Sequence, residues 1–308
     1  MQKPTVSYIS AVYNKADVLL ETLAFLQRQE GVDPNSVEFV FSDDGSTDGS
    51  KELLLAEMRK DDRIKVIQNE SNAGPSLRIN QAANMATGNF LVPIDADDFL
   101  PANATDFLMN CARTQNVPLV FGQSKRGMSC PNIDKDAQVS LIEDALAYCA
   151  KKSIVHMGFL VKASIWENAQ GANPEVFIQD QSLPLRLSAE AQKLAYVHDV
   201  VYWLRPAGNE NLSQNIAQQH HDRFFSAWPM LKNRNASQAA KKALMRQIIS
   251  TLWKQHRDAN TLLPQFSTPF VRYILNRAVS YGLSDAALTK ASKYLLSLPD
   301  IRRPGVDV

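Results

Sequence analysis

Cysteine is scarce in this 308-residue chain, which contains only Cys111, Cys130 and Cys149 and no CxxC pair. An odd number of cysteines without that spacing argues against a disulfide framework and against a zinc site. No apolar run approaches the roughly 18–20 residues that span a bilayer. The N-terminus leads into a strand pattern without the apolar core of a signal peptide. We therefore expect a protein of the reducing cytoplasm.

Two common nucleotide-binding signatures are also missing. The sequence contains neither the GxxxxGK[ST] phosphate-binding loop nor the GxGxxG dinucleotide fingerprint. No basic triphosphate-binding loop stands early in the chain, which argues against a nucleotidyltransferase. No nucleic-acid-binding motif is present either, so nucleic acid is not an expected partner.

Charge is balanced overall but unevenly distributed along the chain. Residues 1–200 carry 18 Lys and Arg against 26 Asp and Glu, whereas residues 201–308 carry 15 against 6. The two parts therefore have net charges of −8 and +9, which sum to the formal net charge of +1. The chain is an acidic body followed by a basic region, and its 45% of hydrophobic residues is ordinary for a globular protein.

The first half of the chain alternates strand and helix patterns. β-Rich runs at 5–13, 37–42, 63–69, 89–94 and 117–122 are separated by helical patterns of 10–15 residues. This alternation predicts an α/β fold with a Rossmann-like, mostly parallel sheet flanked by helices. We further predict a helix near Val139–Ala150 and a wholly helical end from about Asn215.

Polar side chains follow three of these predicted strands. Because the carboxyl ends of parallel strands meet at one edge of a sheet, where ligands bind, these side chains are expected to converge. A cluster of carboxylates is typical of a site for Mg²⁺ or Mn²⁺. Considered alone, the DADD stretch fits a solvated loop equally well. The converging residues are Tyr13 and Asn14, Asp43 and Asp44, and Asp95, Asp97 and Asp98.

Three motifs occur in one order: YN after the first strand, then FSDDGSTDGS, then NAGPSLRINQAANMATGNFLVPIDADD. Together they resemble glycosyltransferase family 2, whose members have the GT-A fold, over about Val6 to Arg205. The resemblance implies an inverting, metal-dependent transferase that moves a sugar from a nucleotide diphosphate, UDP above all, to a glycan or lipid-linked acceptor. Mn²⁺ or Mg²⁺ would be the cofactor, and a bacterial surface polysaccharide such as lipopolysaccharide or capsule the product. The implied domains are a GT-A domain at 1–213 and a basic helical region at 214–308.

The resemblance also assigns roles to single residues. Asp44 would bind the nucleotide base, with turn and cap chemistry as its alternative. Asp97 would be the direct metal ligand, and Asp95 would hold the metal or the donor sugar, while Asp98 supports the turn. The other implied donor-binding residues are Ala11, Tyr13, Asn14, Asp43, Arg78, Asn80, Ala96 and Arg205.

Two departures from the family pattern affect these roles. The usual Ala-Arg-Asn reads Arg78-Ile79-Asn80, so Arg78 stands one position early and either reaches the nucleotide or lies on a helix surface. The downstream acidic pair reads Gln179-Asp180. Asp180 matches the general base that deprotonates the acceptor hydroxyl, with a helix N-cap role as the alternative. The neutral Gln179 removes a negative charge beside this base, which is expected to lower its pKa.

Residues 236–257 form an amphipathic helix pattern with a basic side. One interpretation is attachment to an anionic membrane surface, or to a partner, near a lipid-linked acceptor; the other is a helical bundle with a solvated basic face. A catalytically silent sugar-nucleotide-binding or scaffolding subunit is the alternative function for the whole chain. The apolar stripe is Leu244, Ile248 and Leu252, opposite Lys242, Arg246, Lys254 and Arg257.

Overall fold

The computed structural model describes residues 5–206, 215–259, 265, 267–279, 282–299 and 301–305. Within these residues the strands form one eight-stranded sheet in the order β3-β2-β1-β4-β7-β5-β8-β6. The N-terminal half of the sheet is parallel, as the strand–helix alternation predicts, and its strands are largely buried except for the half-buried edge strand β3. These strands are β1 (Val6–Val12), β2 (Val37–Asp43), β3 (Ile64–Ile67) and β4 (Phe90–Pro93).

The second half of the sheet is mixed. The short strand β7 pairs antiparallel with both β4 and β5, whereas β5 and β8 are parallel and β6 forms an antiparallel edge on β8. This half extends the sheet beyond β4 and brings the end of β8 next to the acidic cluster. Its strands are β5 (Leu119–Arg126), β6 (Val139–Ile142), β7 (Leu160–Lys162) and β8 (Leu194–Leu204).

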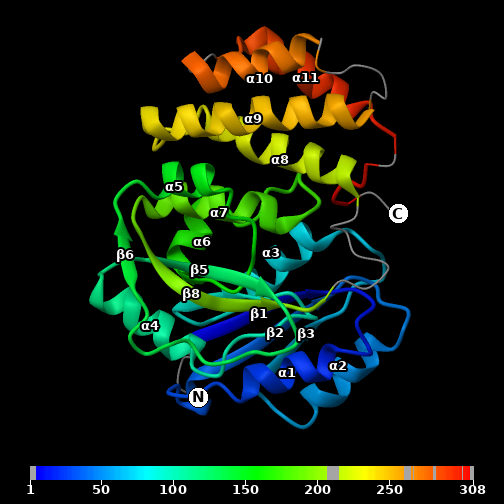
Figure 1. Ribbon diagram of the computed structural model, residues 1–308. Helices are drawn as coiled ribbons and strands as arrows, with labels where there is room; N and C mark the ends of the chain where they lie inside the picture. Colours follow the sequence, from blue (N-terminus) through cyan, green and yellow to red (C-terminus); the bar gives the residue numbers. More distant parts are fainter. Residues whose placement is uncertain are drawn as a thin grey trace.

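Helices cover both faces of the sheet (Figure 1). On one face lie α1 (Leu19–Gln27), α2 (Ser50–Met58) and α4 (Ala104–Thr114), whose apolar residues pack on the strands. On the other face lie α3 (Pro75–Met85), α5 (Ala145–Lys152), α6 (Ala163–Ala169) and α7 (Gln179–Ala191). This layering positions α3 and α7, the two helices that carry the predicted site residues Arg78 and Asp180, over the same side of the sheet.

The C-terminal helices form further layers above α5 and α7 (Figure 1). Leu244 and Ile248 are fully buried in α9, so the predicted apolar stripe is confirmed as a packing surface. The predicted domain boundary at 213/214 lies outside the described residues and stays a prediction. None of the helices in the described part of the chain is long and apolar enough to cross a membrane. The helices are α8 (Ile216–Met230), α9 (Gln238–Ala259), α10 (Thr268–Val279) and α11 (Asp285–Leu296).

The predicted helix over Val139–Ala150 is wrong in its first part. Val139–Ile142 is strand β6, and the helix α5 begins only at Ala145, where the Asp144 side chain accepts a hydrogen bond from Ala147 N. Pairing with β8 supplies the edge strand with backbone hydrogen bonds, and this tertiary pairing overrides the local helical pattern.

Candidate functional site

The ends of β1 and β2 meet through the Asn14 side chain and backbone. Asn14 has a left-handed backbone (φ 50°), and its N–H donates to Ser46 Oγ at 3.1 Å while its Oδ1 accepts from Thr47 N at 2.9 Å. Tyr13 beside it is 41% exposed, so its ring is available to a ligand. Ala11 lies within β1 and pairs with Ser42 of β2. The three residues thus line one edge of the sheet, as the sequence predicts.

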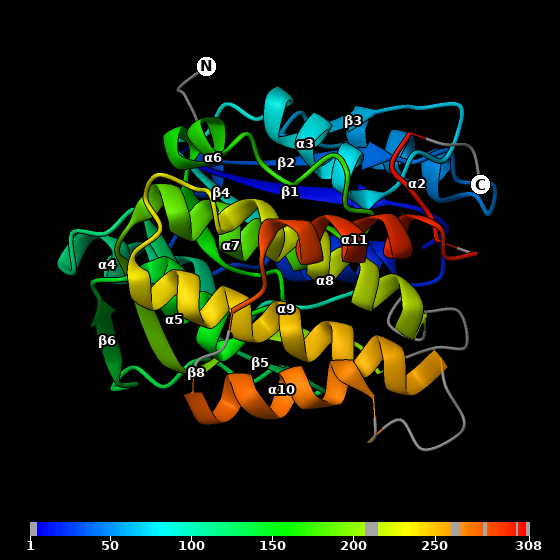
Figure 2. The same cartoon turned by 90° about the horizontal axis from the view of Figure 1, so that it is seen from above.

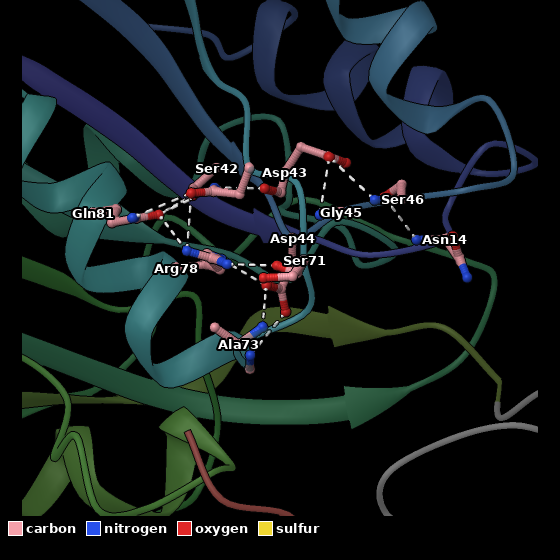
Figure 3. A network of polar contacts seen from close by, with 12 residues as sticks. Asn14, Ser42, Asp43, Asp44, Gly45, Ser46, Ser71, Ala73, Arg78 and Gln81 are labelled. Atoms are coloured by element: carbon pink, nitrogen blue, oxygen red, sulfur yellow. Dashed lines mark hydrogen bonds and ion pairs between the residues drawn. The ribbon is translucent and has the colours of Figure 1, made fainter. Parts of the chain in front are cut away.

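The two adjacent acids after β2 have different surroundings. Asp43 is fully buried and its Oδ2 accepts from Gly45 N and Ser46 N, both at 3.1 Å, which is turn chemistry (Figure 3). Its Oδ1 is buried without a hydrogen-bond partner among the described residues. Asp43 therefore shapes the turn that presents Asp44, and its predicted contact with the donor stays a prediction.

Asp44 is joined to the start of α3 by three hydrogen bonds (Figure 3). Its Oδ1 accepts from Ala73 N at 2.7 Å and from Arg78 Nε at 2.6 Å, and its Oδ2 accepts from Gly74 N at 2.9 Å. The N–H groups at a helix start favour a carboxylate, and burial strengthens the ion pair. Asp44 is thus a rigid, negatively charged group at the sheet edge.

Arg78 is buried, with 6% of its surface exposed, so the helix-surface alternative for this residue is wrong. Its remaining guanidinium N–H groups donate to Asn69 Oδ1 at 2.9 Å and to Ser71 O at 2.7 Å. Arg78 therefore holds together the loop before α3, and its one-position shift still brings it onto Asp44.

The cluster after β4 is linked to β8 through one tyrosine. The Tyr202 hydroxyl lies 2.6 Å from Asp98 Oδ2 and 3.2 Å from Asp95 Oδ2, and it accepts from Asp95 N at 3.2 Å. Burial and then the neighbouring Asp97 raise the pKa of Asp98 to about 6. Burial, Asp98 and Asp97 likewise raise the pKa of Asp95 well above its usual range. Tyr202 has no obvious signal in the sequence because its contacts depend on the position of β8.

Asp97 is the member of the cluster that already contacts a cation. Its Oδ2 lies 2.5 Å from Lys15 Nζ, and the two side chains are 24% and 31% exposed. Lys15 is not among the residues predicted from the sequence, although its place directly after Asn14 puts it at the same edge of the sheet. A positive charge at Asp97 is therefore electrostatically favoured.

Asp98 and Arg205 support the turn rather than facing outward. Asp98 Oδ1 accepts from Arg205 N at 2.7 Å, and Arg205 Nε donates to Asp97 O at 2.9 Å. The Arg205 guanidinium also pairs with Glu21 at 2.6 Å and lies 4.4 Å from the centroid of the Phe99 ring. The expectation for Asp98 agrees with these contacts, whereas binding of the donor diphosphate by Arg205 stays a prediction.

Asp180 lies in the first turn of α7. The N-cap of this helix is Ile178, and no side chain of the cap residue bonds to it, so the interpretation of Asp180 as the N-cap is wrong. Asp180 Oδ1 is buried without a hydrogen-bond partner among the described residues. Burial and then the neighbouring Asp222 raise the pKa of Asp180 to about 7, while Arg223 acts in the opposite direction. The expected effect of Gln179 on this pKa stays a prediction.

Gln179 connects the helix of Asp180 to the acidic cluster. Its Nε2 donates to Asp95 Oδ1 at 2.8 Å. A glutamate at this position would have no N–H to donate, and it would repel Asp95. The neutral replacement of the family acid thus forms a direct bridge between the end of β4 and the start of α7.

Two other predicted residues have structural partners. The Asn80 side chain bonds to both backbone groups of Ala172, with distances of 2.8 Å to N and 2.9 Å to O. Ala96 is buried within the turn of the acidic cluster, with 2% exposure. A direct contact of either residue with a donor stays a prediction.

Tight binding of a divalent cation at this site needs ligands beyond the protein side chains, such as phosphate oxygens. The described residues contain no group of three or more His, Cys, Asp or Glu side chains that could hold a metal ion by themselves. Mg²⁺ commonly binds one or two carboxylates together with waters and substrate phosphates. The partly exposed carboxylate of Asp97, which already faces an ammonium group, meets that requirement.

Residues 7–143 match the family model described as glycosyl transferase family 2. Among curated proteins, a GalNAc(5)-diNAcBac-PP-undecaprenol beta-1,3-glucosyltransferase of Campylobacter jejuni is 28% identical over 204 residues, which cover 63% of this chain and 62% of that enzyme. Glycosyltransferase GlyG of Streptococcus pneumoniae is 27% identical over 117 residues, 38% of each chain. The chain thus spans less than two thirds of the length of both relatives.

Among solved structures, S. aureus TarS 1-349 in complex with UDP-GlcNAc has a TM-score of 0.68 at 18% identity, covering 87% of this chain and 79% of that one. The mannosyltransferase PcManGT from Pyrobaculum calidifontis, in complex with GDP-Man and Mn²⁺, has a TM-score of 0.58 at 19% identity, with coverage of 97% and 82%. These similarities show that the sheet and its flanking helices have the GT-A fold and that C-terminal helices extend it.

Proposed function

We propose that this chain, of which residues 7–143 match glycosyltransferase family 2, transfers a sugar from a nucleotide-diphosphate donor to an acceptor hydroxyl with inversion. UDP is the proposed nucleotide, and a glycan or lipid-linked saccharide is the proposed acceptor. The TarS complex contains UDP-GlcNAc, and the Campylobacter relative is named for an undecaprenol-linked acceptor, which supports both assignments. The proposed setting is synthesis of a bacterial surface polysaccharide.

One observation carries the proposal: the helix of the candidate base is hydrogen-bonded to the candidate donor site. Gln179, next to Asp180, donates to Asp95 at 2.8 Å. Direct displacement at a sugar carbon needs a base on the face opposite the leaving diphosphate. It therefore needs the base and the donor site to be held at a fixed separation. The Gln179–Asp95 bond provides that fixed relation.

Asp180 is suited to be the general base. A carboxyl with a pKa of about 7 holds a proton more firmly than an ordinary aspartate does, and it is still largely ionised slightly above neutral pH. Its Oδ1 has no partner among the described residues, so it is free to accept the proton of an acceptor hydroxyl. Arg223 opposes the rise in pKa and so keeps the carboxyl ionisable.

Donor binding is assigned to the other edge residues. Asp44, held by α3, would accept from the N–H of the base, and the exposed Tyr13 ring would lie beside it. Asp97 would hold Mn²⁺ or Mg²⁺, with Asp95 beside it. When bound, such an ion neutralises charge on the departing diphosphate. Lys15, which contacts Asp97, can move to a phosphate oxygen when the carboxylate takes another cation.

The silent-subunit alternative would retain nucleotide binding without turnover. The raised pKa of Asp180 supports the enzyme over this alternative, because catalytic acids and bases are often perturbed in this way. The two functions differ in the consequence of Asp180→Asn, which would stop catalysis in an enzyme and change nothing in a scaffold.

Thermal unfolding with nucleoside diphosphates tests the donor site. We expect UDP to raise the melting temperature in the presence of Mn²⁺ or Mg²⁺ and to lose this effect in EDTA. A ligand at about 100 times its Kd stabilises the folded state by about 2.7 kcal/mol. ADP, CDP and GDP are the controls that show whether the site distinguishes uracil from the other bases. No response to any nucleotide, with or without metal, would overturn the proposed function.

A further inference from the structure

The segment that follows α11, residues 301–305, returns from the helical layer to the sheet. Figure 2 shows it leaving α11 and reaching the side of the molecule where α2 and α3 lie. Gly305 has a left-handed backbone (φ +76°), and its N–H donates to Ala73 O at 2.9 Å. The N–H of the same Ala73 donates to Asp44, so the segment contacts the loop that fixes the proposed base-binding carboxylate.

The same segment is fixed to α8 by a buried amide. Gln218 is fully buried, and it makes a reciprocal pair of bonds with the Arg302 backbone: Arg302 N donates to Oε1 at 2.7 Å and Nε2 donates to Arg302 O at 3.1 Å. Nε2 also donates to Asp222 Oδ1 at 2.9 Å, and Asp222 Oδ2 accepts from Ile178 N at 2.8 Å. Ile178 is the N-cap of α7, the helix of Asp180.

A third contact lies between these two. The Arg302 guanidinium is 5.7 Å from the centroid of the Phe177 ring, within the range of a cation–π contact. Phe177 packs against Gly74 so closely that a Cβ there would stand 2.6 Å from the ring. Its carbonyl also accepts from Ser76 Oγ at 2.9 Å. The Arg302 side chain therefore covers the wall shared by the Asp44 loop and the start of α7.

We propose that residues 301–305 form a clamp that fixes the Asp44 loop relative to the N-terminus of α7, and that the clamp is needed for tight binding of the donor nucleotide. One end bonds to Ala73 and the other, through Gln218 and Asp222, to Ile178. The two halves of the site come from distant parts of the chain, and preorganisation of both raises affinity. The clamp rests on the proposed function, and it lies outside residues 7–143 that match the family model.

The test compares the Kd of UDP with Mn²⁺, by isothermal titration calorimetry, for the full chain and four variants. A chain that stops after Asp300 lacks the clamp, and Gly305→Pro removes its donated N–H and its backbone geometry. Arg302→Ala removes the contact with Phe177. Arg303→Ala is the matched control, because it removes an equal charge from the same segment, and its guanidinium donates to Leu296 O instead.

The shortened chain is expected to bind UDP about tenfold more weakly, and Gly305→Pro and Arg302→Ala about threefold more weakly. Arg303→Ala should stay within about twofold of the full chain. Hydrogen exchange at Ala73, Gly74 and Ile178 should quicken in the first three variants, because the clamp protects these amides.

Three other results have distinct meanings. A full chain that binds no nucleotide would overturn the proposed function and this inference with it. A full chain that binds UDP while every variant binds equally well would overturn the clamp and leave the function standing. Equal weakening by Arg302→Ala and Arg303→Ala would also overturn it, since general charge attraction would then explain the effect. If the shortened chain fails to fold, the Kd of UDP for Gly305→Pro and Arg302→Ala decides whether the clamp affects nucleotide binding.

Discussion

At the residue scale, the proposed general base Asp180 also affects stability. Its folded pKa of about 7 exceeds the ordinary value of 3.8, so the folded state binds its proton more tightly than the unfolded state does. The free energy of unfolding therefore falls as pH rises from about 4 to about 7, and the whole loss is present above pH 7. The buried Asp180 carboxylate thus destabilises the protein above neutral pH, a cost that the proposed role as a general base would explain.

Asp180→Asn should remove this loss. We expect the variant to be more stable than the wild type by roughly 1–3 kcal/mol at pH 8 and by clearly less at pH 5. Urea unfolding at the two pH values measures the difference. Asp106→Asn on α4, far from Asp222, is the control and should show no such pH dependence. A variant that is less stable than the wild type at pH 8 would contradict the placement of Asp180.

Lys15 and Asp97 give a second prediction at this scale. Because the ammonium group of Lys15 pairs with the proposed metal ligand at 2.5 Å, Lys15→Met should free the carboxylate. Binding of Mn²⁺ without nucleotide, followed by the electron paramagnetic resonance signal of free Mn²⁺, should tighten by about three- to tenfold. Lys51→Met on α2 is the control, because it removes an equal charge from a side chain whose Nζ lies 4.0 Å from Glu52 Oε1. This variant should bind Mn²⁺ as the wild type does. Equal Mn²⁺ binding by wild type and Lys15→Met would argue against metal binding at Asp97.

At the element scale, the attachment of α3 to the end of β2 depends on the buried pair of Asp44 and Arg78. Arg78→Met leaves a buried carboxylate with only its two backbone donors, Ala73 and Gly74. We expect a loss of about 3 kcal/mol in the free energy of unfolding, measured with denaturant. Arg113→Met, which changes an exposed arginine on α4, should cost less than about 0.5 kcal/mol. If both variants lose a similar amount of unfolding free energy, the Asp44–Arg78 ion pair does not contribute more to stability than an exposed arginine does.

Local pattern alone predicts the elements of the first half, where helices alternate with the parallel strands β1 to β4. It fails at β6, because only the pairing of Val139–Ile142 with β8 makes that segment a strand. The local pattern also predicts which residues form α7, but it does not predict which side chains pack around them. The pKa of Asp180 is raised first by burial and then by Asp222 of α8, which lies more than 40 residues further along the chain.

At the scale of the whole molecule, the sequence predicts the convergence of Asn14, Asp44 and Asp97 at one edge, since parallel strands impose it. It does not predict the contacts that join this edge to the rest of the chain. Tyr202 and the 301–305 segment reach the site through tertiary packing with no motif of their own, and the Gln179 motif does not indicate that its side chain bonds to Asp95.

The membrane-surface hypothesis for the basic helices stays a prediction at this scale. Helices α9, α10 and α11 together carry nine Lys and Arg against two Asp. Val271, Ile274, Leu275 and Leu296 are exposed on the outer two. Such a surface should bind vesicles that contain phosphatidylglycerol in a sedimentation assay, and binding should fall as salt rises because surface charges are screened. Neutral phosphatidylcholine vesicles are the control. No sedimentation with anionic vesicles at low salt would leave the solvated bundle as the interpretation.

We propose above all that Asp180 takes the proton from the acceptor, which is water where no sugar acceptor is added, as it attacks a donor sugar held by other residues. The most direct test measures release of UDP from UDP-glucose and UDP-N-acetylglucosamine by the wild type and by Asp180→Asn, together with the Kd of UDP for each. The prediction is a loss of about 10²–10⁴ in turnover for Asp180→Asn with the UDP Kd unchanged within about twofold, and full activity for Asp106→Asn. Equal turnover by the wild type and Asp180→Asn would contradict it.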